Sequence, residues 1–317
     1  MPAYSEARIL IIGAGSAGSR HARNLLRAGA RVALTDPDGQ RAAAVEGAEP
    51  VPFDLEGLQR FDGIVVASPS VYHLEQTSAA LAAGTKVMVE KPLATTTDGL
   101  DALVALDEGR VMVGYNLRLH DPVVRLVQWL HDGLVGEPLT MRLWFGHFLP
   151  AWKQGMDYRT TYSASASLGG GVLFDAIHEL DLLVWMLGSD YDVIGAVVDR
   201  LGDLEIDVED TVRALLRHSG GTIVEIELDY LSRRYRRGIE VIGGLGTLRL
   251  DWAAARLELE TEARSERVPV STPVSRSYEL EAEAFLGFLR GDAKPPVDAA
   301  TAAASVGLAE QIRRAAQ

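Results

Sequence analysis

The chain has 317 residues, of which 47% are hydrophobic and 24% are charged, as in globular proteins that bury large cores. The formal net charge of −13 repels phosphate backbones and anionic lipids, so we expect neither a nucleic-acid partner nor a membrane. The absence of cysteine excludes disulfides, thiolate nucleophiles and cysteine-based zinc sites, and no other residues have the spacing of a metal site.

Short apolar runs alternate with amphipathic stretches in the N-terminal third. The runs are almost wholly apolar, as expected for parallel strands that helices cover on both faces. This alternation predicts a doubly wound parallel α/β sheet. We predict strands over Arg8–Ile12, Arg31–Thr35, Gly63–Ala67, Lys86–Glu90 and Arg110–Gly114, and helices over Ala17–Arg27, Val71–Ala83 and Asp98–Asp107.

The pattern changes near residue 120. Most of the segment from Asp192 to Leu259 alternates polar and apolar residues, which predicts a large, mostly antiparallel sheet with one solvated or oligomeric face. We therefore expect two domains, 1–119 and 120–317, the second also of α/β type. Its other predicted elements are a strand over Leu139–Phe148, a loop over Leu149–Leu168, and helices over Pro122–His131, Val172–Leu187, Tyr278–Leu289 and Ala299–Ala315.

No targeting or membrane segment is evident. The opening residues lack a basic region followed by a cleavable apolar stretch, and no run reaches the ~18 apolar residues of a membrane span. We therefore expect a cytoplasmic protein.

Three glycines stand between the first predicted strand and the first predicted helix, in Gly13-Ala-Gly15-Ser16-Ala17-Gly18. The first permits a tight turn, the second lets the backbone approach a pyrophosphate, and the third allows close packing of helix and strand. The helix N-terminus would supply N–H groups for the phosphates. A purely structural turn is the alternative, but the flanking elements favour a dinucleotide site.

Asp36 ends the second predicted strand. Its carboxylate would accept hydrogen bonds from ribose hydroxyls and repel a 2′-phosphate, so we expect NAD as the cofactor. NADP is the alternative, because Arg41 offers a nearby cation. Asp36 could instead only begin the Asp-Pro-Asp-Gly turn.

Glu90-Lys91-Pro92 stands at the carboxyl end of a predicted strand. Ligands of open parallel sheets bind at this edge. A lysine there can stabilise a developing alkoxide or donate to a substrate hydroxyl. The alternative is a surface lysine that merely ends a strand.

The segment 169–188, GGGVLFDAIHELDLLVWMLG, predicts a buried helix with few polar positions. Asp175 and His178 are three residues apart and would share one helical face. A carboxylate orients a neighbouring imidazole and raises its basicity, while apolar surroundings oppose its charging, which suits a general base. The alternative is that Asp175 caps the helix and His178 is a core histidine.

Together these motifs resemble the glucose–fructose oxidoreductase / inositol dehydrogenase / MocA (Gfo/Idh/MocA) family. Each motif is modest, but their order and spacing are specific. The resemblance rests on GAGSAG at 13–18, Ala67-Ser68-Pro69 followed by His73, Glu90-Lys91-Pro92, Gly114-Tyr115-Asn116-Leu117-Arg118, and Asp175, His178 and Asp181 with Trp185.

The resemblance implies an NAD(P)-binding Rossmann domain and a C-terminal α/β domain whose open sheet often makes dimer or tetramer contacts. Lys91 would contact the reacting hydroxyl, His178 would be the acid/base, and Asp175 would bind substrate and support His178. The family commonly separates the last two by four residues rather than three, which leaves their division of labour open. Further cofactor contacts are implied for Ser68, Pro69, His73, Glu90 and Lys91.

The loop before the buried helix offers stacking faces and hydrogen-bond donors suited to a polyhydroxylated ring. Arg118 or Arg159 could hold a carboxylate or phosphate of the substrate by a bidentate contact. His147 and His218 look like isolated structural residues, and Trp152 and Tyr162 could also be core or dimer contacts. The candidate substrate residues are Asn116, Arg118, Trp152, Tyr158, Arg159 and Tyr162.

The leading interpretation is an NAD(P)-dependent dehydrogenase or reductase that moves a hydride between nicotinamide and a secondary alcohol of a sugar, cyclitol or sugar derivative. One alternative is an NAD-dependent glycoside hydrolase of the same fold. Another is a non-catalytic dinucleotide-binding sensor, although a sensor has no need of Lys91, Asp175 and His178 together.

Overall fold

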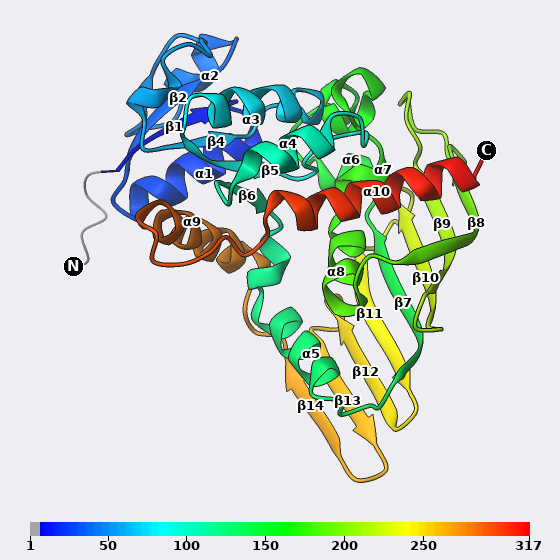
Figure 1. Cartoon of the computed structure of the whole chain (residues 1–317). Helices are drawn as coiled ribbons and strands as arrows, with labels where there is room; N and C mark the ends of the chain where they lie inside the picture. Colours follow the sequence, from blue (N-terminus) through cyan, green and yellow to red (C-terminus); the bar gives the residue numbers. More distant parts are fainter. Residues whose placement is uncertain (1–6) are drawn as a thin grey trace. The chain divides into compact units, whose positions relative to one another are not determined.

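The computed structural model describes residues 7–317 (Figure 1). Residues 1–6, where the opening segment assessed above begins, lie outside the described residues. The chain forms two compact units: the first runs to Asn116 and includes Val274–Ala303, and the second comprises Leu117–Pro273 and Ala304–Gln317. The first break lies close to the expected boundary at residue 119, whereas the return of 274–303 to the first unit was not expected.

The six strands of the first unit are all parallel and lie in the order β3-β2-β1-β4-β5-β6. The chain reverses its direction of travel across the sheet between β1 and β4, the place where doubly wound sheets bind ligands. The predicted doubly wound parallel sheet is confirmed. The strands are β1 (Arg8–Ile12), β2 (Arg31–Thr35), β3 (Glu49–Pro50), β4 (Gly63–Val66), β5 (Lys86–Glu90) and β6 (Val111–Gly114).

Two of the predicted helices begin later than expected. Residues Ser70–Tyr72 form a 3-10 turn, so α3 starts only at His73. Gly99 has a φ of +80°, a left-handed conformation that an α-helix cannot include, so α4 starts at the next residue. The short α2 and β3 were not predicted. The helices between the strands are α1 (Ser16–Arg27), α2 (Gly39–Ala43), α3 (His73–Ala82) and α4 (Leu100–Asp107).

A helix from far along the chain completes the first unit. α9 (Val274–Arg290) lies beside α1 in Figure 1 and buries Phe285 and Phe288 in the same core as Ile9 of β1. Lys86 Nζ donates a hydrogen bond of 2.6 Å to the backbone oxygen of Phe288 and so helps to cap the end of α9. Burial of these aromatic rings explains why α9 belongs to this unit.

The second unit is built on an eight-stranded sheet of order β14-β13-β12-β11-β7-β10-β9-β8. Only β7 and β10 pair in parallel, so the prediction of a mostly antiparallel sheet is confirmed. β14 was not predicted, because a short charged edge strand carries little apolar signal. The strands are β7 (Pro138–Gly146), β8 (Tyr191–Asp199), β9 (Thr211–His218), β10 (Ile223–Asp229), β11 (Arg236–Gly243), β12 (Gly246–Asp251), β13 (Arg256–Thr261) and β14 (Ser265–Pro269).

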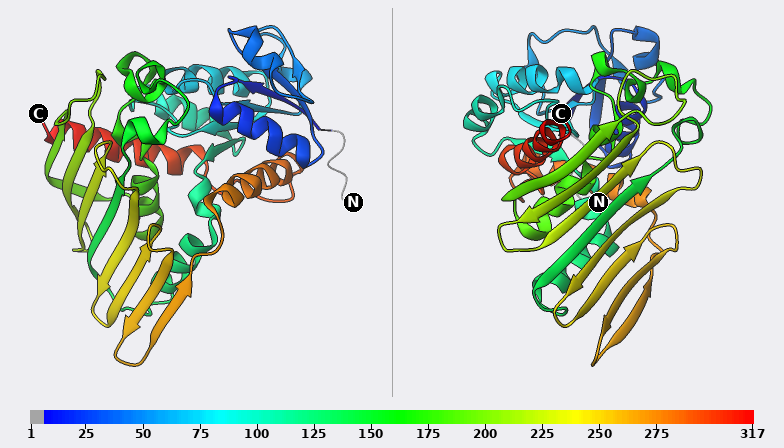
Figure 2. Two further views of the ribbon diagram at one scale, coloured as in Figure 1. Left: turned by 180° about the vertical axis from the view of Figure 1, so that it is seen from behind. Right: turned by 90° about the vertical axis from the view of Figure 1, so that its right-hand side faces the viewer.

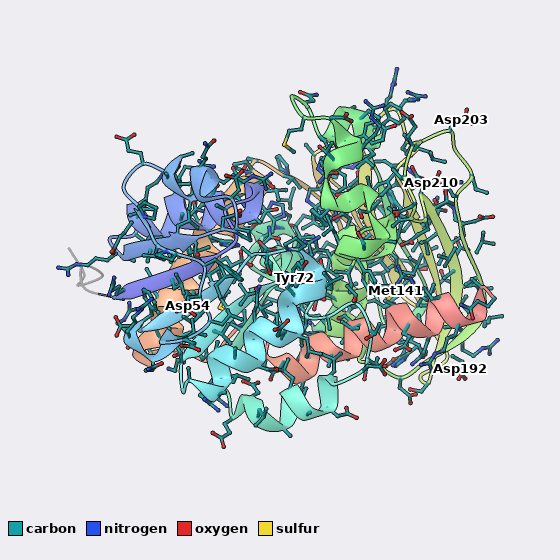
Figure 3. The ribbon with its side chains drawn as sticks, turned by 90° about the horizontal axis from the view of Figure 1, so that it is seen from above. Asp54, Tyr72, Met141, Asp192, Asp203 and Asp210 are labelled. Atoms are coloured by element: carbon teal, nitrogen blue, oxygen red, sulfur yellow. The ribbon has the colours of Figure 1, made fainter. Side chains whose placement is uncertain are left out.

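One face of this sheet packs against helices of the unit. Figure 2 shows the sheet from orange β14 at one edge to yellow-green β8 at the other. Its inward side chains are buried, among them Met141 of β7, which Figure 3 labels. The covering helices are α5 (Asp121–His131), α7 (Val172–Asp175) and α8 (His178–Leu187).

Several boundaries in the second unit differ from expectation. The single helix predicted over Val172–Leu187 is wrong, because Ala176 and Ile177 interrupt it and separate α7 from α8. The predicted strand ends at Gly146 rather than Phe148, and α6 (Leu149–Trp152) opens the segment expected to be a loop. α10 (Ala299–Ala315) begins in the first unit and ends in the second.

Within residues 7–317, no helix has both the length and the apolar character needed to span a bilayer.

Candidate functional site

The glycine turn after β1 has the three properties expected from its sequence. Gly13 has a φ of +102°, and a Cβ there would lie 2.6 Å from the backbone oxygen of Ala67. A Cβ on Gly18 would lie 1.8 Å from the oxygen of Gly13, so only glycine allows this helix–strand packing. Around Gly15, in contrast, no atom of the described residues other than Gly15 and its two chain neighbours lies within 4 Å of the Cβ position.

The start of α1 fits a dinucleotide phosphate. Gly15 is its N-cap and no side chain caps the helix, so the N–H groups of the first turn, which includes Ser16 and Ala17, have no side-chain acceptor at the cap. Backbone N–H groups and the helix dipole favour an anion at this position. The open position beside Gly15 supplies the room that a pyrophosphate needs.

Asp36 lies over this turn, immediately after β2. Its Oδ2 accepts a hydrogen bond of 2.7 Å from the N–H of Ala14, and its Oδ1 accepts one of 2.9 Å from the N–H of Asp38. The carboxylate is therefore fixed beside the glycine turn. Arg41, the cation that left NADP open, instead pairs with Asp38 at 3.3 Å.

His73 joins the loops that follow β4 and β5. This buried imidazole has Nε2 at 2.9 Å from the oxygen of Ser68 and Nδ1 at 2.6 Å from the oxygen of Pro92. Burial lowers the pKa of His73 despite these two carbonyls. The contacts favour a structural role for His73, which aligns the segments that contain Ser68-Pro69 and Lys91-Pro92.

Glu90, at the end of β5, is buried and ionised. Its Oε1 lies 2.7 Å from Nε2 of His21 and 3.7 Å from Nη2 of Arg20, and its Oε2 accepts the N–H of Lys91 at 3.2 Å. Burial opposes ionisation, but His21, then Arg20 and Lys91, outweigh it and hold the pKa of Glu90 below its usual range. Lys91 follows directly at this sheet edge and is half-buried.

In the second unit, a glycine and a glutamate form the start of α7. Gly171 has a φ of +106°, and a Cβ there would lie 2.3 Å from Oε1 of Glu209. The Glu209 carboxylate accepts the N–H of Leu173 at 3.2 Å and lies 3.3 Å from Nη2 of Arg313 in α10. Glu209 therefore caps this helix, the structural role that the sequence had offered for Asp175.

Asp175, at the end of α7, is held by two phenols. Tyr162 donates to its Oδ1, and Tyr230 donates to its Oδ2 at 2.6 Å. Burial, and then the Asp175 carboxylate, raise the pKa of Tyr230 well above its usual value, so this phenol remains a donor. His178 is buried and begins α8 on the far side of the helix break.

Tyr230 was not identified from the sequence. It follows the last residue of β10, and nothing in its spacing links it to a helix 55 residues away. Its ring also belongs to an aromatic cluster around Trp152, whose centroid lies 5.3 Å from that of Phe145, 5.7 Å from that of His147 and 6.2 Å from that of Tyr230. His147 is thus part of this cluster rather than an isolated strand residue.

Two arginines expected to bind a substrate anion have protein partners. Arg118 forms a bidentate ion pair with Asp181, with Nε–Oδ2 at 2.9 Å and Nη2–Oδ1 at 2.7 Å, and both side chains are buried. Arg159 makes the same kind of contact with Asp157 and also reaches Glu205 at 2.9 Å. Asp181 and Glu205 are distant in the sequence, whereas Asp157 stands two residues before Arg159 and could have been considered. These contacts favour structural roles for both arginines.

Two other expected substrate residues also have structural contacts. Asn116 is buried, and its Nδ2 donates a hydrogen bond of 2.6 Å to Oγ of Ser277 in α9. The Tyr158 hydroxyl accepts the N–H of Glu205 at 3.2 Å. Trp152 and Tyr162 are the two members of the predicted substrate set that lie with Asp175 and Tyr230 in one cluster.

Comparison with known proteins identifies both halves of the chain. Residues 7–115 match the family described as "Oxidoreductase family, NAD-binding Rossmann fold", and residues 123–249 match the "GFO/IDH/MocA C-terminal domain". The chain is 32% identical over 293 residues to inositol 2-dehydrogenase from Acidothermus cellulolyticus, covering 86% of this chain and 82% of that protein. The chain belongs to the GFO/IDH/MocA oxidoreductase family.

The chain is also similar to a second relative and to a solved structure. The 1,5-anhydro-D-fructose reductase of Ensifer adhaerens is 30% identical over 69% of this chain and 64% of its own length. The fold matches that of the WlbA dehydrogenase from Bordetella pertussis in complex with NADH and UDP-GlcNAcA, with a TM-score of 0.83 and 24% identity over 98% of this chain and 94% of that chain.

Family membership and the parallel sheet establish an NAD-dependent oxidoreductase that acts on CH–OH groups. Within this GFO/IDH/MocA protein, the glycine turn and Asp36 are the residues that fit the dinucleotide.

The glycines of the turn allow a matched test. Gly15→Ala places its methyl group in open space, so the free energy of unfolding should hold within about 0.5 kcal/mol while NAD affinity falls at least tenfold, because the methyl group blocks the phosphate. Gly18→Ala should lower the free energy of unfolding instead, because its methyl group meets the oxygen of Gly13. Denaturant titration measures the free energy of unfolding of the two variants, and calorimetric NAD titration measures their affinity for NAD. Equal NAD affinity in Gly15→Ala and wild type would contradict the assignment.

Removing one phenol tests the support of Asp175. Tyr230→Phe deletes the donor to Oδ2 and should lower kcat about tenfold with NAD affinity unchanged, since a buried hydrogen bond to a charged group contributes about 1.5–3 kcal/mol. Tyr191→Phe is the control, because that hydroxyl donates to the backbone oxygen of Leu183 at 3.3 Å in the same unit. Steady-state kinetics at saturating NAD are the measurement, and wild-type kcat in Tyr230→Phe would refute this role.

Proposed function

We propose that this protein oxidises or reduces a secondary alcohol of a sugar or cyclitol with NAD. The observation that carries the proposal is Asp175, fixed by Tyr162 and Tyr230 three residues before the buried His178. Stacking faces beside polar groups suit a polyhydroxylated ring, and Trp152 supplies such a face beside Tyr230. The relatives named inositol 2-dehydrogenase and 1,5-anhydro-D-fructose reductase support this substrate class.

In the proposed mechanism, His178 takes the proton of the substrate hydroxyl and Lys91 stabilises the developing alkoxide. Asp175 orients the substrate and the imidazole of His178, and the phenols of Tyr162 and Tyr230 fix its own position. Bound NAD supplies the hydride acceptor. The carbinol C–H bond breaks with its electron pair, so the products are a ketone, NADH and a proton on His178; reduction runs the same steps backwards.

Asp36 supports a preference for NAD over NADP. Its carboxylate stands beside the glycine turn, where a 2′-phosphate would meet its negative charge. Arg41, paired with Asp38, is not directed by any described contact toward such a phosphate.

We further propose a cytoplasmic homodimer or homotetramer formed through the eight-stranded sheet. Apolar side chains are exposed on strands of this sheet, with Ile194 51%, Val197 48% and Ile242 45% exposed. Burial of such side chains against a second copy stabilises association. The lack of cysteine suits a reducing compartment.

The substrate class is tested by a screen. NAD and NADP are each offered inositols, aldoses, uronic acids and amino sugars, and absorbance of reduced nicotinamide is followed. We expect NADH from at least one polyol, with NADP much poorer. Release of sugar from glycosides without net NADH would favour a hydrolase, and tight binding of a protein partner with no polyol active would favour a sensor.

His178→Ala should retain NAD affinity and lose about a hundredfold or more in turnover, because the proton acceptor is gone. His218→Ala is the matched control, since that half-buried imidazole packs on Tyr191 at 5.1 Å in β9 of the same unit. Turnover on the polyol found in the screen and calorimetric NAD titration are the measurements. Wild-type turnover in His178→Ala would remove this histidine from the mechanism.

A further inference from the structure

A second buried carboxyl group lies near Glu90 in the first unit. Glu281, on α9, is 1% exposed, and neither of its carboxyl oxygens has a hydrogen-bond partner among the described residues. A Cβ built on Gly114 would lie 3.4 Å from Cα of Glu90 and 3.5 Å from Oε1 of Glu281. The absence of a side chain at Gly114 therefore leaves the space in which this carboxyl group approaches the end of β5.

Two charged groups act on this carboxyl group, Arg20 of α1 and Glu90 at the end of β5. The positive charge of Arg20 is shared, because its guanidinium lies 3.7 Å from Glu90 and stacks on the ring of Tyr278 at 3.9 Å. Glu90 thus has direct cationic and imidazole partners, whereas no residue from 7 to 317 donates a hydrogen bond to Glu281.

A carboxyl group that is buried without a hydrogen-bond donor among the described residues cannot ionise at low cost. Burial, and then the negative charge of Glu90, raise the pKa of Glu281 well above its usual range, although Arg20 opposes this. Burial and the charge of Glu90 thus both favour the neutral acid form of Glu281.

We propose that Glu281 is a positioning residue for Lys91 and acts through Glu90, because its buried carboxyl group lies beside Gly114, next to the end of β5 from which Lys91 extends. Glu90 uses one oxygen for His21 and the other for the N–H of Lys91, so its position fixes the backbone from which Lys91 extends. An ionised Glu281 would repel Glu90 and disturb that backbone. This role rests on the proposed function of Lys91.

The effect on stability has a definite sign. A carboxyl group whose pKa is raised in the folded protein contributes stability that is complete below its unfolded pKa and is lost as pH rises through the folded pKa. Wild type should therefore lose stability with rising pH above about 4.5 through this group. Glu281→Gln, which keeps the shape and cannot ionise, removes this loss.

The experiment compares wild type with Glu281→Gln and with the control Glu283→Gln. Glu283 lies on the same helix but is exposed and pairs with Arg276 at 3.2 Å. The difference in melting temperature between Glu281→Gln and wild type should increase in favour of the variant by on the order of 3 °C for each pH unit above about 4.5. The control should show no such trend.

Infrared difference spectra and kinetics complete the test. At pH 8 the spectrum of wild type minus Glu281→Gln should contain the C=O stretch of a protonated carboxylic acid. We expect the kcat/KM of wild type to fall at alkaline pH as Glu281 ionises, and we expect a smaller fall in Glu281→Gln. Absence of both the C=O band and the melting-temperature trend would overturn the neutral acid. The band with an unchanged alkaline limb would overturn the positioning role.

The melting, infrared and kinetic measurements also distinguish a failure of this inference from a failure of the proposed function on which it rests. If no polyol is oxidised by wild type, the proposed function fails, while the infrared and melting measurements still decide the protonation of Glu281. If turnover is observed but both the band and the melting-temperature trend are absent, only the inference about Glu281 fails.

Discussion

The parallel register of β1, β4 and β5 is the constraint on which the proposed chemistry depends. Ile12 pairs with Val66, and Val66 pairs with Val89, so the residues that follow these three strands emerge at one edge of the sheet. The imidazole of His73 then joins two of the emerging loops through the carbonyls of Ser68 and Pro92. Glycine turn, Ser68-Pro69 and Lys91 are thereby presented along a single edge, as a dinucleotide site requires.

In the second unit, a helix break and the end of a strand position the polar cluster around Asp175. Its polar cluster depends on a helix that stops at Asp175 and starts again at His178, with Glu209 capping the first part. Tyr230 reaches Asp175 from the end of a strand, so the sheet itself holds the carboxylate. Buried polar groups that are fully hydrogen-bonded rigidify a site, whereas partly satisfied ones destabilise it.

Sequence was informative wherever one local pattern determines structure. Parallel strands covered on both faces are continuous apolar runs, and the conformations of Gly13 and Gly18 follow from steric limits that only glycine meets. Asp36 was found for the same reason, since it ends a strand beside that turn. The family resemblance, confirmed by comparison, rested on these local motifs.

What sequence could not supply were partners distant along the chain. Arg118 looked available for a substrate anion because Asp181 lies 63 residues away from it. For Arg159 the distance explains only Glu205, 46 residues away, because its other partner, Asp157, lies two residues before it. The helix break was hidden, because Ala176 and Ile177, which form it, are residues that a continuous helix also accepts. α9 could be recognised as a helix, but only its packing on the first sheet assigns it to that unit.

The central claim is direct hydrogen transfer from a carbinol carbon to NAD, and the fate of that hydrogen tests it most directly. Polyols deuterated on carbon are incubated with the protein and NAD, and the reduced cofactor is analysed by mass spectrometry. The account predicts NADH that carries a single deuterium, in an amount equal to the ketone formed. Ketone or free sugar produced with no deuterium in the cofactor pool would contradict it.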